Sequence, residues 1–439
     1  MVYIKHISLI LVLLQISMAG IAQRKKNDKV KINQSPKQEL VYDNVNYLEQ
    51  IQSVEIYPLG KENQLPIYTL NGSDILTVSF DDLRADIRNL YYNIEHCNAD
   101  WTPSRVSVLD YAEGYNEDRI MDFQSSQGTL INYTHYSFTF PNQYVRPKIA
   151  GNYLLKVYED SDKLRLLLTR KFYVVRPLVQ IDAEILNSIA INKRHTNQKI
   201  NVSIKSGLTI SNPHRDIQVH ILQNQRTDNM MILQKPMFIA NNEIKYNLAE
   251  SLDFPAGNEF RYADLRSFKG GSAQTQNIQI DSTIAVYLYP DQSNSSQSYA
   301  SVHDENGRFS IRNIDYDHAT INAEYANVHF ALDASADLKG SIYIVGGFND
   351  YKRTTKNELI YNKESKLWEV NFLMKQGLYD YEYVLDDENR ILNTTIFSGS
   401  HWDTGNDYQI LVYYRRTGTY WDEILGFKNI SINNKENKN

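Results

Sequence analysis

Short apolar segments that alternate with polar positions recur along almost the whole chain, and Gly, Pro, Asn or Asp usually bounds them. Alternating runs rich in β-branched and aromatic residues favour half-buried strands. The predicted strands include Ser53–Tyr57, Ile75–Phe80, Leu90–Glu95, Tyr133–Phe140, Asn152–Tyr158, Leu164–Val175, Gln180–Leu186, Lys199–Lys205, Asp216–Gln223, Ile278–Tyr289, Thr320–Leu332, Ser341–Val345 and Leu378–Leu385. Helical periodicity is scarce, and only Asp81–Asn89 is expected to form a helical turn or two, with Asp81 as its cap. The pattern predicts an all-β protein built from sandwiches.

Changes in composition divide the chain into segments. Residues 24–46 are rich in Lys, Asn and Gln and are predicted to be a disordered segment. We expect three consecutive immunoglobulin-like β-sandwich domains at residues 47–177, 178–326 and 327–428, followed by a flexible tail at 429–439. Pro177 marks the first boundary, because proline cannot donate a hydrogen bond within a β-ladder.

The first 23 residues have the layout of a cleavable secretory signal. Lys5 precedes an apolar run from Ile7 to Leu14, and small residues follow up to Ala22. We expect cleavage after Gln23 or after Ala22. No later stretch approaches the ~20 apolar residues of a transmembrane helix. The sequence therefore predicts an exported protein that is not itself inserted in the membrane.

Composition narrows the classes of function. Cys97 is the single cysteine, so no internal disulfide can form, and the fold must be stabilised by its apolar cores. The formal net charge of −6 argues against nucleic acid as a partner, because phosphates select a concentrated basic face. The 32 tyrosines fit sheet faces on which the ring packs and the hydroxyl reaches water, and they equally fit an exposed docking surface.

Candidate enzyme chemistry is weak. His96 and Cys97 are neighbours in sequence, so on a strand their side chains point to opposite faces and cannot form a thiol–imidazole dyad. Cys97 is expected to be a small buried apolar residue instead. Neither a Gly-x-Ser-x-Gly elbow nor a phosphate-binding glycine loop occurs. We predict that the protein is not an enzyme, although a glycan-active hydrolase with an unidentified pair of carboxylates stays a distant alternative.

Metal and cofactor sites are not predicted either. The 10 histidines show no His-x-x-x-His spacing. The acidic residues Asp81, Asp82 and Asp86 lack the Gly and the terminal Glu of a calcium-binding loop. The polar run Asp386–Asn389 is typical of a hairpin turn.

An ordered set of segments resembles the type IX secretion plug family of Bacteroidota. The segments that carry the resemblance are Tyr47-Leu48, Leu65–Ile67, Leu76–Leu83, His96–Trp101, Asp110-Tyr111, Gly114-Tyr115, Tyr133–Tyr136, Phe140–Asn142, Ala150–Leu155 and Leu168–Phe172. The resemblance implies an exported three-domain β protein at the periplasmic face of the outer membrane. There it would close a large β-barrel translocon, and other periplasmic translocon subunits are further implied partners. The family supplies no catalytic residues to carry over.

Loops of the first domain are the candidate contacts with the barrel. Three loops, Asn98–Val108, Asp110–Ile120 and Phe140–Ile149, supply the candidates Asn98, Asp100, Trp101, Tyr111, Tyr115 and Tyr144. Aromatic residues often carry most of the binding energy at protein interfaces. The alternative that Trp101 and Tyr111 only pack the end of the first sandwich stays open.

The third domain has a second, partial likeness. Gly340–Tyr351, Trp368 and Gly377–Tyr383 resemble early-set immunoglobulin-like modules, which include glycogen-binding domains. This resemblance implies an alternative function, an exported carbohydrate-binding protein in which Tyr351 and Trp368 stack on sugars. The competing interpretation is that both rings fill the core or a joint between domains. The end of the chain, Asn433–Asn439, does not look like the sorting domain of type IX cargo.

Overall fold

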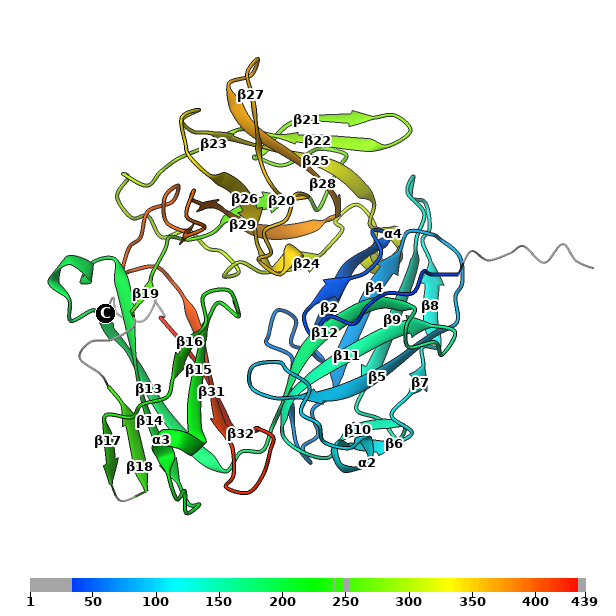
Figure 1. Cartoon of the computed structure of the whole chain (residues 1–439). Helices are drawn as coiled ribbons and strands as arrows, with labels where there is room; N and C mark the ends of the chain where they lie inside the picture. Colours follow the sequence, from blue (N-terminus) through cyan, green and yellow to red (C-terminus); the bar gives the residue numbers. More distant parts are fainter. Residues whose placement is uncertain (1–33, 241, 248–252, 433–439) are drawn as a thin grey trace, which may run out of the picture. The chain divides into compact units, whose positions relative to one another are not determined.

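Strands make up nearly all of the regular structure in the computed structural model, which describes residues 34–240, 242–247 and 253–432 (Figure 1). Helical segments within these ranges have only three or four residues: α2 (Val108–Tyr111), η2 (Ile191–Lys193), α3 (Pro213–Asp216), α4 (Ala319–Asn322) and η3 (Gly347–Asn349). The prediction of an all-β protein with several sandwiches is confirmed. The predicted secretory signal, residues 1–23, lies outside the described residues.

The first sandwich has two facing sheets. One has the strand order β2 (Ile51–Pro58), β4 (Leu76–Asp82), β9 (Thr134–Phe140), β8 (Asp122–Ser125). The other contains β7 (Asp118–Arg119), β5 (Leu90–Cys97), β11 (Gly151–Glu159) and β12 (Leu166–Val175), and β12 also pairs with β1 (Val45–Asn46) and β3 (Ile67–Thr69). Apolar side chains of both sheets, such as Phe80 and Phe172, meet in one buried core. A separate pair, β6 (Ala112–Gly114) and β10 (Val145–Pro147), lies next to α2 at one end of this sandwich (Figure 1).

The second sandwich is built from two distant parts of the chain. One sheet contains β13 (Val179–Asn187), β14 (Asn197–Ser206), β18 (Glu243–Tyr246), β17 (Phe238–Ala240) and β19 (Phe254–Pro255). The other contains β16 (Met231–Leu233), β15 (Ile217–Gln223), β31 (Asp407–Tyr414) and β32 (Glu423–Ser431). Because Val175 of β12 pairs with Ile424 of β32, this second sheet continues into the first sandwich.

The third sandwich is formed by the chain between these two parts. One sheet contains β21 (Thr275–Ile280), β22 (Ile284–Leu288), β23 (Asp291–Gln292), β25 (Tyr325–Asp333), β28 (Leu367–Lys375) and β27 (Ile360–Asn362). Opposite it, β29 (Gly377–Asp386) pairs with β20 (Arg261–Asp264), β24 (Phe309–Ile311), β26 (Ser341–Val345) and β30 (Leu392–Asn393). Phe330 and Tyr381 pack edge to face inside its core.

The strand pairing corrects the predicted order of domains. Residues 178–326 and 327–428 were expected to form separate sandwiches, but β20 and β24 pair with β29 of the third sandwich. Conversely, β31 pairs along its length with β15 of the second sandwich. The third sandwich is therefore inserted within the second. Local alternation cannot reveal such an insertion, because it predicts a strand without specifying its partner.

Two short segments also differ from expectation. Of the predicted disordered segment at 24–46, residues 43–46 lie beside β12, where the Thr169 hydroxyl donates to the Asp43 carbonyl and Val45 pairs with Thr169. Residues 429–431, predicted to belong to a flexible tail, continue β32. The predicted helical turn at Asp81–Asn89 is absent, since Asp81 and Asp82 end β4 and no helix is assigned across this described stretch.

Candidate functional site

The structure places the six predicted contact residues in three settings: a joint between sandwiches, the interior of the first sandwich, and an exposed end of that sandwich. Trp101 lies at the joint of the first and second sandwiches, where its ring meets Tyr173 edge to face at 5.5 Å and the Lys171 ammonium lies 4.7 Å from its centroid. The neighbouring Ala99 amide donates to Asp422 of the second sandwich at 2.9 Å. Of the three candidates on this loop, Asn98 and Trp101 are half-buried and Asp100 is exposed. This loop joins two sandwiches of the same chain.

Tyr111 also packs inside the first sandwich. Its side chain is 5% exposed, and its hydroxyl donates to the Ile94 carbonyl at 3.4 Å. Its ring meets Tyr153 edge to face, with 6.2 Å between centroids. These contacts support the interpretation that Tyr111 packs the end of the sandwich.

Tyr115 and Tyr144 are different, because they form an exposed pair. Their side chains are 84% and 40% exposed, and their rings stack with 6.2 Å between centroids. The Tyr144 carbonyl accepts the amides of Tyr115 and Asn116 at 2.9 and 3.1 Å, which fixes the two chain segments side by side. Gly114 permits this approach: its φ is +86°, and a Cβ there would lie 2.3 Å from the Tyr144 carbonyl oxygen.

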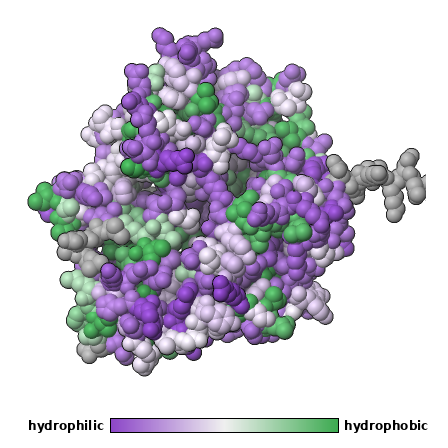
Figure 2. All heavy atoms as spheres, in the orientation of Figure 1, coloured by the Kyte–Doolittle hydropathy of each residue, from purple (hydrophilic) through white to green (hydrophobic). Residues whose placement is uncertain are grey.

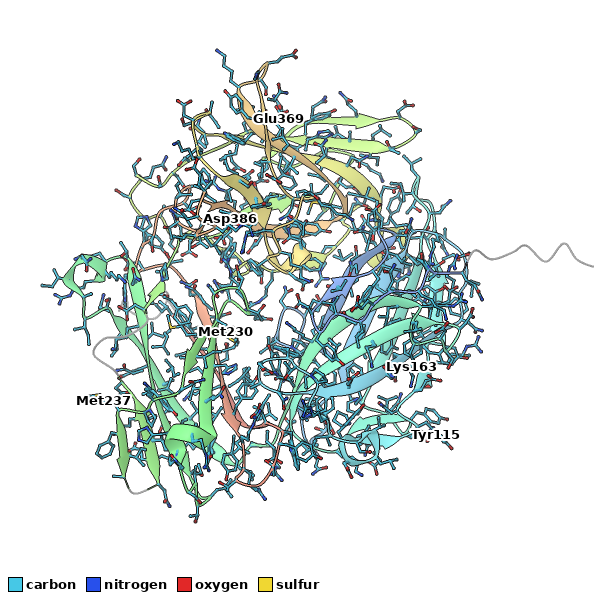
Figure 3. The ribbon with its side chains drawn as sticks, in the orientation of Figure 1. Tyr115, Lys163, Met230, Met237, Glu369 and Asp386 are labelled. Atoms are coloured by element: carbon cyan, nitrogen blue, oxygen red, sulfur yellow. The ribbon has the colours of Figure 1, made fainter. Side chains whose placement is uncertain are left out.

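Further apolar groups extend this surface. Val108 and Leu109 of α2 are 46% and 78% exposed at the same end of the first sandwich. We call the set Val108, Leu109, Tyr115 and Tyr144 the tyrosine end, and Figure 3 marks Tyr115 there. A shallow depression beside it is lined by Tyr91, Tyr115, Glu117, Asp118, Arg119, Tyr144 and Lys163. Aromatic groups beside polar and charged ones are typical of a surface that binds another protein.

Tyr351 and Trp368, the two candidate sugar-binding rings, both pack against neighbouring groups of the chain. Tyr351 is 7% exposed, its hydroxyl donates to the Gly307 carbonyl at 3.1 Å, and the Arg226 guanidinium lies 4.4 Å from its ring centroid. Trp368 is half-buried, donates its indole N–H to the Ser335 carbonyl, and packs against Tyr361. Both sets of contacts favour the interior-packing alternative.

Cys97 is fully buried, as the sequence predicts. Burial is the main cause that raises the pKa of its thiol to about 12, and burial lowers the pKa of His96 to about 4. The His96 ring makes a contact of 3.2 Å with the Ala150 carbonyl rather than with the thiol. A thiol nucleophile needs the thiolate form, which this environment disfavours.

We expect Cys97 to be unreactive in the folded protein. Ellman's reagent at pH 8 should modify almost none of the thiol in the native state, because the sulfur is both inaccessible and protonated. The same protein in guanidinium chloride should react completely. Rapid modification of the native protein would contradict the described packing.

A buried ionic cluster, which the sequence pattern did not reveal, joins the first and third sandwiches. The Asp81 carboxylate accepts hydrogen bonds from Lys375 at 2.6 Å, from Tyr325 at 2.7 Å and from His135 at 2.7 Å. The Lys375 ammonium also lies 4.1 Å from the centroid of the Tyr133 ring. Asp81 therefore binds a cation of another sandwich rather than capping a helix. In the sequence, the sign of this buried cluster is Lys375, a single lysine that follows the apolar residues Phe372–Met374 at the end of β28.

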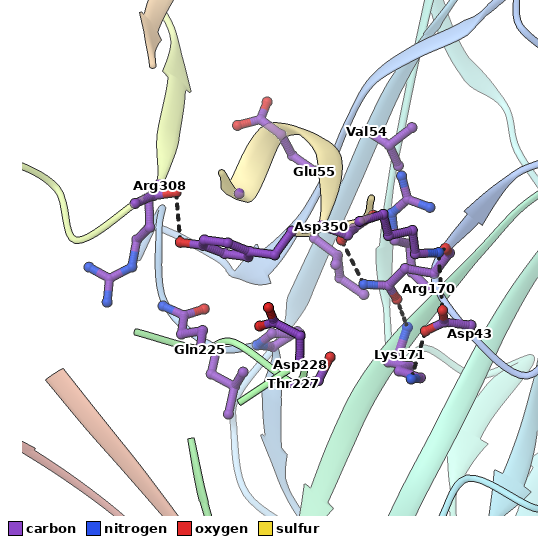
Figure 4. Close-up of a pocket in the computed structure, with 18 of the residues that line it drawn as sticks. Asp43, Val54, Glu55, Arg170, Lys171, Gln225, Thr227, Asp228, Arg308 and Asp350 are labelled. Carbon is purple, nitrogen blue, oxygen red and sulfur yellow. Dashed lines mark hydrogen bonds and ion pairs between the residues drawn. The ribbon is translucent and has the colours of Figure 1, made fainter. Parts of the chain in front are cut away.

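A cavity of about 640 Å³ lies where the three sandwiches meet (Figure 4). Its wall contains parts of β2 and β12, the loop Asn224–Asp228 of the second sandwich, and the segment Gly347–Thr354 of the third. Most of its charges are paired: Asp43 binds Lys171 at 2.7 Å and Lys352 at 3.1 Å. The exception is Glu55, whose carboxylate has neither an ion-pair partner nor a hydrogen bond within the described part of the chain.

Among the residues that the structure describes, no group of three or more His, Cys, Asp or Glu side chains could hold a metal ion. In the same residues, no helix has the length and apolar character needed to cross a bilayer.

The fold defines a class: an all-β protein of several sandwiches, with an exposed, stacked pair of tyrosines at one end of the first sandwich. Comparison with known families makes this specific. The family described as the type 9 secretion system plug protein first domain matches residues 51–176. A crystal structure of a hypothetical protein from Parabacteroides merdae ATCC 43184 is similar, with 31% sequence identity and a TM-score of 0.86. The similarity covers 90% of this chain and 100% of that one.

The chain belongs to the family of type 9 secretion system plug proteins. The predicted family is thus confirmed, and it indicates a role related to type IX secretion, a location in the cell envelope, and a structural or accessory part. No curated protein matches the sequence.

Proposed function

We propose that this protein is a non-catalytic periplasmic plug that docks on the outer-membrane translocon barrel of type IX secretion and occludes it. The observation that carries the proposal is the family match at residues 51–176, which spans most of the first sandwich and includes the tyrosine end. The proposal assigns docking to this sandwich. Other periplasmic subunits of the translocon are further proposed partners.

A plug must be a rigid body, and the contacts between the sandwiches hold them in a fixed arrangement. The buried Asp81–Lys375 pair joins the first sandwich to the third, and a hydrogen bond of 2.7 Å from the Tyr413 hydroxyl to Asn152 joins the second to the first. Arg308 and Asp407, 2.7 Å apart, join the third to the second. Bonded and buried contacts of this kind resist relative movement of the sandwiches.

A plug must also release its partner, which limits how apolar its contact surface can be. Polar residues dominate the face shown in Figure 2, and apolar residues occur there in small separate groups. At the tyrosine end, two rings and two aliphatic side chains lie beside charged residues such as Glu117 and Arg119. Aromatic groups supply binding energy, while a polar rim keeps the contact reversible.

The combined change Tyr115→Ser and Tyr144→Ser is expected to abolish recovery of the barrel from outer-membrane extracts by the tagged protein. An aromatic hot spot contributes about 2 kcal/mol, so losing the pair should weaken binding by at least about 30-fold. Both side chains are exposed, so the variant should fold normally.

A matched control is the pair Tyr289→Ser and Tyr420→Ser, whose side chains are 57% and 56% exposed elsewhere on the chain. The control should recover the barrel as the wild type does. If both variants recovered the barrel equally well, docking would have to involve a surface other than the tyrosine end. Failure of the wild type to recover any large barrel protein would contradict the proposed function itself.

A further inference from the structure

The wall of the central cavity includes the free edge of a strand. Four consecutive residues of β2, from Val54 to Tyr57, line the cavity. Successive side chains of a strand point to opposite faces, so four residues in a row can line one space only if the strand presents its edge to it. β2 is the outermost strand of its sheet, which agrees with this arrangement.

The hydrogen-bond pattern of β2 shows which main-chain groups face the cavity. The Leu59 amide donates to the Ile75 carbonyl at 2.7 Å, so residue 59 is hydrogen-bonded towards β4. Bonded and non-bonded positions alternate along an antiparallel pair, so Tyr57 and Glu55 are also bonded to β4, opposite Thr77 and Ser79. The amide and carbonyl of Ile56 therefore point away from β4. Groups of this kind on a strand edge are a template for pairing with another strand.

Glu55 adds a charge to this edge. Its carboxylate lies near those of Glu62 and Asp81, while the neighbouring cations are engaged elsewhere: Lys375 binds Asp81, and Arg312 binds Glu62. The other acidic side chains of the cavity wall have partners, such as Asp386 with Arg353 at 3.0 Å. Because the nearby cations of the chain are already paired, a strong ion pair with Glu55 requires a cation from another molecule.

We propose that the cavity binds an extended peptide segment that carries a lysine or arginine side chain. The main chain of the segment pairs with Ile56 at the free edge of β2, and its cationic side chain binds the Glu55 carboxylate. Strand addition of this type gives affinity through main-chain hydrogen bonds and specificity through side-chain pockets. The apolar wall residues Leu65, Pro66 and Phe309 suit the flanking side chains. The volume of about 640 Å³ falls within the range of roughly 300–1,000 Å³ that ligand sites occupy.

The test uses the full mature chain and an acetylated, amidated valine–arginine–valine peptide in a calorimetric titration at pH 8. The expected result is saturable binding that falls at least about tenfold in a Glu55→Gln variant. Replacing arginine by neutral citrulline should lower affinity by a similar factor, because it keeps the shape and removes the charge. Methylating the peptide nitrogens should also lower affinity, because it removes the main-chain donors.

Glu388→Gln is the control for charge, since Glu388 is exposed in the turn after β29. This variant should bind the peptide as the wild type does. The proposal is overturned if the peptide does not bind, or if wild type and Glu55→Gln bind it equally. The titration contains no barrel protein, so its outcome is independent of the docking role proposed above.

Discussion

Replacing Lys375 by methionine is expected to lower the free energy of unfolding by about 3–5 kcal/mol, because it leaves a buried carboxylate without its cation. The side chains of Lys375 and Asp81 are each 1% exposed, and their charged atoms are 2.6 Å apart. Burial raises the pKa of Asp81, but the charge of Lys375 and the hydrogen bond from His135 outweigh it and hold the pKa below its ordinary value. Without Lys375, a buried carboxylate would lose its main compensating charge.

The measurement is a urea titration followed by circular dichroism at pH 7. A double variant, Asp81→Leu with Lys375→Met, should regain a substantial part of the lost stability, because it removes both charges together. The control Lys356→Met breaks an exposed pair with Glu49, in which the side chains are 69% and 79% exposed, and should leave the midpoint unchanged. If Lys375→Met unfolded at the wild-type urea concentration, the buried pair would not hold the first and third sandwiches together.

Glu55→Gln is expected to stabilise the protein at pH 8 and to have little effect at pH 4. Burial, and after it the nearby Glu62 carboxylate, raises the pKa of Glu55 from 4.5 to about 7. A group whose pKa is raised on folding contributes stability below its unfolded pKa, and that contribution is lost as the pH rises through the folded pKa. At pH 8 the ionised Glu55 therefore costs on the order of 3 kcal/mol, which a neutral Gln avoids.

The effect is measured as the difference between variant and wild type, by urea titrations at pH 4 and pH 8. The difference is needed because other groups titrate in the same range: Asp380 also has a pKa raised to about 7, mainly by burial. Asp81, Lys375 and Arg312 face Glu55 as well, and they are unchanged in the variant. Glu388→Gln should show no such pH dependence. An equal effect of Glu55→Gln at both pH values would mean that Glu55 is not held in the environment described.

The sequence predicts strands well here because alternation is a local property. The run Leu164–Val175 became β12, and the turn at Asp386–Asn389 connects β29 to β30. It predicts partners poorly, because pairing depends on residues far along the chain. The strands β31 and β15, about 190 residues apart, belong to one sheet, and no local pattern indicates it.

The same reason limits the prediction of the site. The sequence predicts all four aromatic loop residues as docking candidates and cannot tell which are exposed. In the fold, Trp101 and Tyr111 pack internally, while Tyr115 and Tyr144 are exposed. Glu55 was not singled out, because an acidic residue in an alternating strand normally faces water. Its unusual position arises only when the third sandwich packs beside β2.

The most direct test of the proposed plug is the conductance of the purified translocon barrel in a planar bilayer, before and after this protein is added to the periplasmic side. The account predicts that the wild type closes the channel and that the Tyr115→Ser and Tyr144→Ser variant leaves it open. The control with Tyr289→Ser and Tyr420→Ser should close it like the wild type. A barrel that binds the wild-type protein and still conducts fully would contradict occlusion.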